Sequence, residues 1–151
     1  MSYSVTGEES LRALAQVPLF SGLDESALMI VSTAILFRKG PSGLRVIREG
    51  EEGDALYILL SGEARVSKRV SDNQDTVLAE LGPGDHFGEM SLIDDEPRSA
   101  SVELAADSEF MQLDKQTFRD VLGAEPRVIE AVLKGLSRRL RAANERLGAA
   151  V

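Results

Sequence analysis

One segment of the sequence, residues 81–102, combines residue types that could bind a small anion. It holds five carboxylates and a single arginine, Arg98, so it is not a generally basic surface. Gly88 would let a ligand approach the backbone closely, and residues 89–93 are long enough for one helical turn whose free N–H groups face that ligand. Pro97 favours an extended conformation at the residue before it and so directs the chain toward Arg98. The segment therefore predicts a pocket where a short helix and one arginine meet an anion.

The rest of the composition argues against most catalytic chemistry. The sequence has no cysteine, which excludes disulfides, thiol nucleophiles and thiolate metal sites. Its single histidine, His86, cannot form a His-pair metal site and has no matching serine and acid framework, so we expect a strand or turn residue. The glycines at 82, 84 and 88 miss the spacing of a dinucleotide-binding loop by one residue. We expect no catalytic residue, no metal, no cofactor and no enzyme activity.

Size and charge limit the class of protein further. A chain of 151 residues suits one domain, here residues 1–151, with a sizeable core. Its formal net charge of −8 argues against broad nucleic-acid binding. The longest apolar runs, 27–31 and 55–60, are far shorter than the roughly 20 residues that span a bilayer. The N-terminus shows no export signal, so we expect a cytoplasmic protein with no membrane partner.

The hydrophobic pattern predicts a mainly β protein with flanking helices. Apolar residues recur at helical spacing at about 8–33, where Pro18 closes a first helix and Asp24 caps a second. From about residue 35 to 113, β-forming runs alternate with turn signals, as in an antiparallel barrel. The polar run 71–75 reads as a hairpin loop. The expected strands are residues 44–48, 55–60, 63–70, 76–81, 100–104 and 109–113.

Helices are expected again at about 115–148. Asp114 can cap the first of them, Gly123 can stop it, and Pro126 can start a long last helix. The charged residues of that last helix are expected to form a mostly solvated face. Apolar residues form a seam at a/d heptad spacing, which could pack on the barrel or pair with its twin in a parallel homodimer, our preferred interpretation. The seam is Ile129, Leu133, Leu136, Leu140, Ala143 and Leu147.

Residues 87–102 also carry a longer pattern: Phe87-Gly88-Glu89, then Leu92, then Pro97-Arg98-Ser99-Ala100-Ser101-Val102. This pattern resembles the phosphate-binding cassette of the cyclic nucleotide-binding domain family. A second motif agrees with it in order and distance, and is similar to the β-roll of that family. It comprises Gly50, Gly53-Asp54, Leu56-Tyr57-Ile58-Leu59, Ser61-Gly62-Glu63 and Val66. Residues 18–23 resemble the helical entry of the family, so the resemblance covers roughly residues 10–147.

The resemblance implies an antiparallel, jelly-roll-like β-roll and a role for each cassette residue. Arg98 would hold the exocyclic phosphate oxygens, because a planar cationic fork binds two oxygens at once. Glu89 would accept a hydrogen bond from the ribose 2′-hydroxyl. Ser99 would add a hydroxyl near the phosphate, yet a serine there also suits a guanine, so cyclic AMP and cyclic GMP both remain open. The ligand-binding residues are expected to be Phe87, Gly88, Glu89, Met90, Ser91, Arg98, Ser99 and Ala100. One of Arg138, Arg139 or Arg141 would cap the base.

We therefore expect a stand-alone cyclic nucleotide receptor, with cyclic AMP as the preferred ligand, that signals to an unidentified downstream protein by moving its last helix. Regulators of the catabolite activator type continue into a DNA reader, and this sequence ends at Val151 without one. Two alternatives stay open. The chain could be a protein-interaction adaptor that no longer binds nucleotide, or the sensor half of such a transcription regulator.

Overall fold

The structure is a computed structural model that describes residues 1–148. Its helices are α1 (Gly7–Ala15), the 3-10 turn η1 (Pro18–Phe20), α2 (Glu25–Ala34), α3 (Glu89–Asp94), α4 (Lys115–Ala124) and α5 (Pro126–Arg146). Its strands are β1 (Ser2–Tyr3), β2 (Leu36–Gly40), β3 (Arg45–Ile47), β4 (Ala55–Ser61), β5 (Ala64–Ser71), β6 (Gln74–Leu81), β7 (His86–Phe87), β8 (Ser101–Leu104) and β9 (Ser108–Asp114).

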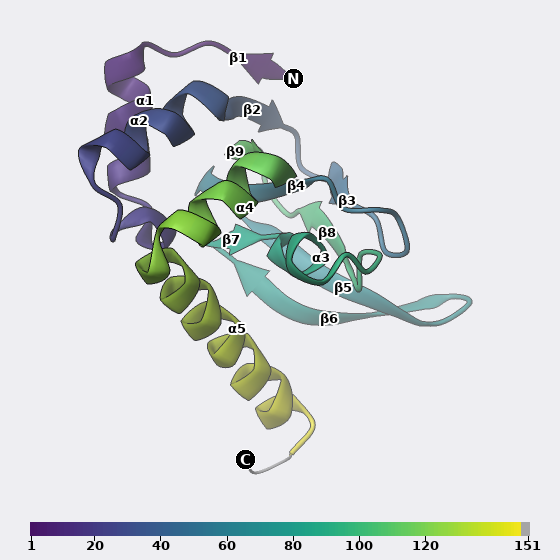
Figure 1. Ribbon diagram of the computed structural model, residues 1–151. Helices are drawn as coiled ribbons and strands as arrows, with labels where there is room; N and C mark the ends of the chain where they lie inside the picture. Colours follow the sequence, from purple (N-terminus) through teal and green to yellow (C-terminus); the bar gives the residue numbers. More distant parts are fainter. Residues whose placement is uncertain (149–151) are drawn as a thin grey trace.

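The strands form two antiparallel sheets, with α1, α2 and α4 gathered at one end and α5 running away from them (Figure 1). One sheet has the order β1-β2-β9-β4-β7 and the other has the order β3-β8-β5-β6. Neighbours in the sheets are often far apart in sequence, as where Ala55 of β4 pairs with Asp114 of β9. This arrangement confirms the predicted mainly β class with flanking helices, an antiparallel β-roll and a long C-terminal helix.

Strand β4 explains how two hydrophobic cores can share one sheet. Successive strand side chains point to opposite faces, and the first five residues of β4 are all buried. Leu56 and Ile58 pack into the core that the N-terminal and C-terminal helices cover. Tyr57 and Leu59 pack into the second core, between the sheets. Each fully buried side chain of this size contributes about 1.5–3 kcal/mol, so β4 anchors both halves of the fold.

Local capping signals in the sequence set most helix boundaries. The carboxylate of Asp24 accepts a hydrogen bond from the backbone N–H of Ala27 at 2.8 Å, and Asp114 caps α4 in the same way. Both caps and the start of α5 at Pro126 were predicted. The predicted stop at Gly123 is wrong, because α4 continues to Ala124. Its C-cap is Glu125, where the following proline disfavours helical backbone.

Strands β1, β2 and β7 are absent from the expected strands. β1 and β7 have two residues each, which is too short for a periodic pattern, and β2 fell at the start of the expected β region. The predicted hairpin loop at 71–75 is also shorter in the structure, because Gln74 pairs with Ser71 and extends both strands. These differences leave the arrangement around residues 87–102 unchanged.

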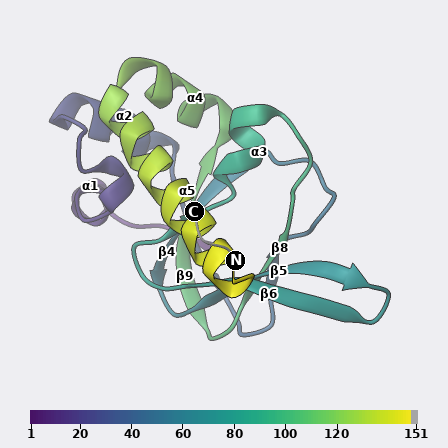
Figure 2. The ribbon, with the colours of Figure 1, turned by 90° about the horizontal axis from the view of Figure 1, so that it is seen from below.

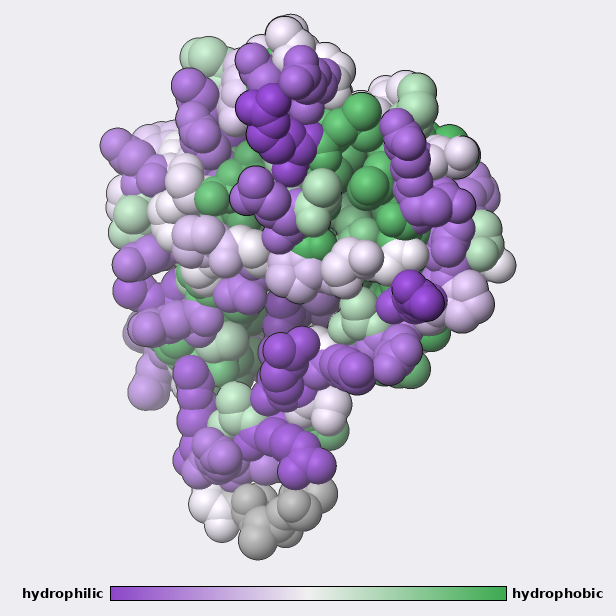
Figure 3. Space-filling model, turned by 90° about the vertical axis from the view of Figure 1, so that its left-hand side faces the viewer, coloured by the Kyte–Doolittle hydropathy of each residue, from purple (hydrophilic) through white to green (hydrophobic). Residues whose placement is uncertain are grey.

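Helix α5 extends away from α4 and the N-terminal helices, along the edge of the β-roll (Figures 1 and 2). Val128 and Val132 face the protein and are buried. The predicted seam is divided: Leu136 and Ala143 are partly buried, whereas Leu133 and Leu140 are about 60% exposed. Ile129 and Leu147 are exposed as well. In the view of Figure 3, hydrophobic surface gathers over the helical end of the molecule, and hydrophilic surface predominates around the end of α5. No helix within residues 1–148 is long and apolar enough to cross a membrane.

Candidate functional site

Arg98 lies at the centre of the segment that the sequence singled out. Its side chain is buried and donates hydrogen bonds to two backbone carbonyls, from Nη1 to Gly88 at 2.6 Å and from Nη2 to Ala55 at 2.8 Å. Within residues 1–148, no carboxylate oxygen lies within 4.0 Å of this guanidinium group. A buried charge without a counter-ion is costly. The arrangement is therefore that of a cation prepared for an external anion.

The electrostatic surroundings of Arg98 support this interpretation. Burial lowers the pKa of its guanidinium group, because a low-dielectric environment disfavours the charged form. The nearby Tyr57, Asp54 and Glu89 act in the opposite direction and raise that pKa. An arginine pKa starts so high that the side chain stays charged at neutral pH despite this burial. A bound phosphate would relieve the desolvation that the carbonyl contacts offset only in part.

Two glycines make room for the arginine. Gly88 has a φ of 90°, in the left-handed region that favours glycine, and directly precedes α3. A Cβ atom at Gly53 would lie 2.8 Å from Arg98 Cζ and 2.6 Å from Ser91 Cβ. Real Cβ atoms do not approach other atoms so closely, so the guanidinium group can lie against this backbone only because residue 53 is glycine.

Glu89 is the first residue of α3 and has only 1% of its side chain exposed. Its Oε1 atom accepts a hydrogen bond of 2.7 Å from Nη1 of Arg139 on α5. The other amino group of Arg139 donates to the backbone carbonyl of His86. Of the three arginines considered for the base, the structure thus brings only Arg139 to the cassette.

His86 lies in β7, beneath α5, as a buried packing residue. A Cβ atom at Gly135 of α5 would lie 3.2 Å from the imidazole Cε1 atom, so the glycine lets the helix approach closely. The Nε2 atom is buried without a hydrogen-bond partner among the described residues and lies 3.7 Å from Glu89 Oε1. Burial lowers the pKa of His86, and the Glu89 charge opposes that shift. The expected strand or turn position is correct.

The remaining candidate residues differ in exposure. Phe87 is buried and stacks on Tyr57, with ring centroids 5.4 Å apart. Ser91 is buried, Met90 is half exposed, Ser99 is exposed and Ala100 is intermediate. The candidate residues thus include one buried and one exposed serine hydroxyl, close in sequence to a buried arginine and a buried carboxylate.

Asp95 fixes the far end of α3 on α4. Its Oδ1 atom accepts from Lys115 Nζ and Arg119 Nη2, each at 2.6 Å, and Arg119 Nε donates to the Leu92 carbonyl. The hydrogen bonds from Arg119 and Lys115 lower the pKa of Asp95 to about 2. These contacts hold the cassette helix in place from the side opposite Glu89.

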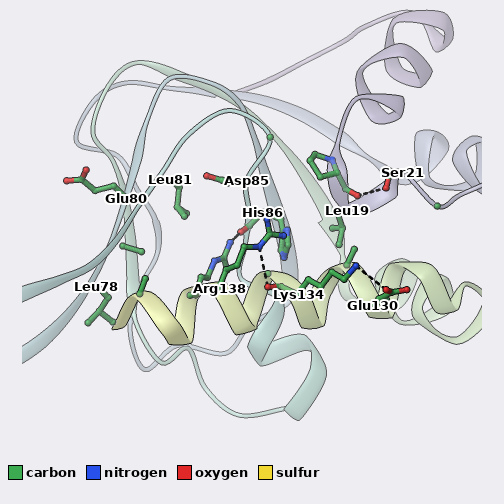
Figure 4. Close-up of a pocket in the computed structure, with 18 of the residues that line it drawn as sticks. Leu19, Ser21, Leu78, Glu80, Leu81, Asp85, His86, Glu130, Lys134 and Arg138 are labelled. Carbon is green, nitrogen blue, oxygen red and sulfur yellow. Dashed lines mark hydrogen bonds and ion pairs between the residues drawn. The ribbon is translucent and has the colours of Figure 1, made fainter. Parts of the chain in front are cut away.

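A cavity of about 660 Å³ lies beside the cassette, between α5 on one side and β6 and η1 on the other (Figure 4). Arg138 and Lys134 of α5 line it, as do Glu80 and Asp85. Lys134 Nζ forms an ion pair with Glu130 Oε1 at 3.1 Å, and Arg138 Nε donates a hydrogen bond of 3.3 Å to the Lys134 carbonyl. His86 and Arg139 also line the cavity, whereas Gly88, Glu89 and Arg98 do not. Arg138 therefore belongs to this cavity, and Arg141 is exposed on α5 outside it.

Gly53, Ala55 and Gly135 lie at the site but were not predicted as site residues. Gly53 belongs to the motif that resembles the β-roll of the family, so the sequence could have indicated that it matters for the site. The Ala55 carbonyl carries no side-chain signal at all. A glycine such as Gly135 inside a helix costs about 1 kcal/mol relative to alanine, and the structure shows that this position packs on His86.

Together, fold and site define a β-roll in which a long helix contacts a segment with a buried arginine and a buried carboxylate. Comparison with known proteins agrees: the sequence profile of the cyclic nucleotide-binding domain matches residues 37–125. This chain belongs to the cyclic nucleotide-binding domain family, as the resemblance implied.

Three relatives illustrate its range. The CRP-like cAMP-activated global transcriptional regulator of Mycobacterium tuberculosis is 34% identical, over 89% of this chain and 60% of its own length. The regulatory domain of Toxoplasma gondii PKA, solved with cAMP, is 37% identical with a TM-score of 0.69, over 76% of this chain and 44% of that one. The regulatory subunit of a cAMP-independent protein kinase A from Trypanosoma brucei is 28% identical with a TM-score of 0.80, over 94% of this chain and 50% of that one. The chain thus spans less than two thirds of each relative's length.

Proposed function

We propose that this protein is a cyclic nucleotide receptor, with cyclic AMP as its ligand, and that it acts as a regulator rather than as an enzyme. The observation that carries the proposal is the buried Arg98, which has hydrogen bonds to two carbonyls and no carboxylate partner among the described residues. The relatives named as cAMP-activated or solved with cAMP support the choice of nucleotide. The cAMP-independent relative shows that the family fold alone does not decide it.

In this proposal, different site residues contact different parts of the nucleotide. Arg98 binds two exocyclic phosphate oxygens through its guanidinium fork, and the Ser99 hydroxyl adds a further contact. Glu89 accepts from the ribose 2′-hydroxyl, since an ionised carboxylate is an acceptor only. Backbone groups of Gly88, Met90 and Ser91 face the ribose and phosphate.

The signal passes to α5 through Glu89. In the described structure Arg139 of α5 already holds this carboxylate, so a ribose hydroxyl that binds there meets the helix directly. A ligand shifts a helix only if it prefers one of the helix positions. Cyclic AMP therefore selects an α5 position that differs from the ligand-free one, and a downstream protein recognises the change.

The exposed part of the α5 seam gives the receptor a means of self-association. Ile129, Leu133, Leu140 and Leu147 remain at least 40% exposed, at the spacing of a parallel two-helix interface. In this proposal two copies pair through α5, so that movement of the helix also alters the dimer.

The first test is calorimetric titration of nucleotide-free protein with cyclic AMP and then with cyclic GMP. We expect saturable binding of one nucleotide per chain, tighter for cyclic AMP. Arg98→Lys keeps the charge and loses the fork, so it should weaken binding by about 2 kcal/mol, or roughly 30-fold. Arg65→Lys, at an exposed β5 position, is the matched control and should bind normally.

Two results would overturn the proposal. Absence of both heat and thermal stabilisation with either nucleotide would favour the adaptor that no longer binds ligand. Unchanged affinity in Arg98→Lys would remove the assigned role of the cassette. The helix mechanism has a separate test: hydrogen exchange in residues 126–146 should differ with and without cyclic AMP, and identical exchange would exclude it.

A further inference from the structure

Lys68 on β5 lies beside the cassette and touches its backbone. Its Nζ atom donates a hydrogen bond of 3.0 Å to the Ser99 carbonyl and one of 3.1 Å to Glu49 Oε2. The other carboxylate oxygen of Glu49 accepts from the backbone N–H of Arg69 at 3.0 Å. One ammonium group therefore joins the cassette, the segment after β3 and the strand β5.

The cassette residues next to Ser99 are held by other means. Arg98 exchanges two backbone hydrogen bonds of 2.8 Å with Gly50 and Glu51. On the far side, the Ser101 hydroxyl accepts from the backbone N–H of Glu49 at 2.9 Å, and Ser101 begins β8. Ser99 lies between these two fixed points and is itself exposed. Within residues 1–148, the hydrogen bond from Lys68 is the contact that fixes its peptide carbonyl.

The energy of this ion pair is small, so its role is one of geometry. The side chains of Lys68 and Glu49 are 49% and 30% exposed, and pairs this open contribute little to folding. The backbone hydrogen bond from Arg69, followed by the Lys68 contact, lowers the pKa of Glu49, so the carboxylate is ionised and fixed on β5. Lys68 is thereby held on the cassette by a partner that cannot easily move away.

We infer that Lys68 is a positioning residue for phosphate binding: it fixes the peptide group of Ser99 and so directs the Ser99 hydroxyl and the adjoining Arg98 toward the exocyclic oxygens. The inference rests on the proposed function, since it needs a phosphate in the cassette. A supporting contact of this kind acts by keeping a ligand-binding group in its productive orientation.

The test is calorimetric titration of cyclic AMP with wild type, Lys68→Met and Lys39→Met. Lys39→Met is the matched control, because Lys39 forms a somewhat more exposed pair with Glu109 at 3.4 Å on the other sheet. We expect Lys68→Met to bind about threefold to tenfold more weakly, the range for losing one hydrogen bond, and Lys39→Met to bind like wild type. Lys68→Arg keeps a donor and should restore most of the affinity.

A Ser99→Ala background separates positioning from simple stabilisation. If Lys68 acts through Ser99, then Lys68→Met should cost clearly less affinity in that background than in wild type, because the two losses overlap. Equal costs in both backgrounds, or wild-type affinity in Lys68→Met, would overturn the inference and leave the proposed function intact. A wild type that binds no cyclic nucleotide would overturn both, and that result is seen before any variant is made.

Discussion

Arg139 and Glu89 connect two parts of the chain that are 50 residues apart, through a hydrogen bond of 2.7 Å between the long helix and the first residue of the cassette helix. The carboxylate is almost fully buried, whereas the arginine side chain is 31% exposed. Loss of the arginine would therefore leave a buried charge without its partner.

Arg139→Ala is expected to lower the free energy of unfolding and to disconnect α5 from the site. We expect a cost of about 1–3 kcal/mol, less than for a fully buried pair because Arg139 is partly solvated. Arg138→Ala, which removes the neighbouring arginine from the adjacent cavity, should cost less than half as much. Denaturant titration measures both losses.

The change of hydrogen exchange in residues 126–146 on adding cyclic AMP should shrink in Arg139→Ala and persist in Arg138→Ala. Equal effects of the two variants would contradict a specific role for Arg139.

Gly53 sets how closely the backbone can approach Arg98. Gly53→Ala would place a Cβ atom 2.8 Å from Arg98 Cζ, so the guanidinium group must shift from its two carbonyl partners. We expect cyclic AMP affinity to fall at least tenfold, on the order of one strong charge-assisted hydrogen bond. The control is Gly82→Ala, where a Cβ atom meets no other atom within 4 Å. Calorimetric titration of both variants provides the comparison, and a normal affinity in Gly53→Ala would show that the contact has no part in binding.

The features that could be predicted from the sequence are those with local causes. Asp24, Asp114 and Pro126 mark helix ends through contacts within three or four residues, so their roles were visible without the fold. Gly88 and Arg98 were visible for a different reason, because both fall in one short segment whose residue pattern the family shares.

The features that could not be predicted depend on contacts across the fold. The choice of Arg139 over Arg138 and Arg141 follows from the rotation of α5, which packs Gly135 on His86. Nothing in the sequence indicates that Gly135 and His86 are in contact. The division of the α5 seam has the same origin, since that rotation buries Val128 and Val132 and leaves Leu133 and Leu140 exposed.

His86 makes stability depend on pH in a direction that can be stated. Burial holds its folded-state pKa below the ordinary 6.5, so the unfolded chain binds the proton first as pH falls. The His86 contribution to stability is therefore present above pH 6.5 and lost as pH falls from there through the folded pKa. The charges of Glu89 and Asp85 favour the protonated imidazole and so reduce the lowering of the His86 pKa. The charges of Arg139 and Arg138 disfavour it and lower that pKa further.

His86→Gln should remove this part of the pH dependence. The variant cannot gain a proton, so its free energy of unfolding should fall less than that of wild type between about pH 7.5 and 5.5, before most carboxylates titrate. Denaturant titration at several pH values measures the two slopes. The offset between the proteins at pH 7.5 reports the altered packing alone, so it does not affect the comparison. Parallel curves would mean that His86 has the same pKa in the folded and unfolded chains.

The exposed side of α5 predicts self-association that depends on two leucines. Leu133 and Leu140 lie one heptad apart and are each about 60% exposed, and apolar side chains in such a row usually meet a partner surface. We expect sedimentation velocity of the wild type to show a dimer that Leu133→Glu with Leu140→Glu converts to monomer. The double substitution of Met29→Glu with Ile30→Glu removes similarly exposed apolar surface from α2 and should leave the dimer unchanged. Because both pairs of substitutions add the same charge, a difference between them assigns the interface to α5. A wild type that stays monomeric at tens of micromolar would instead limit the α5 seam to contacts with other proteins.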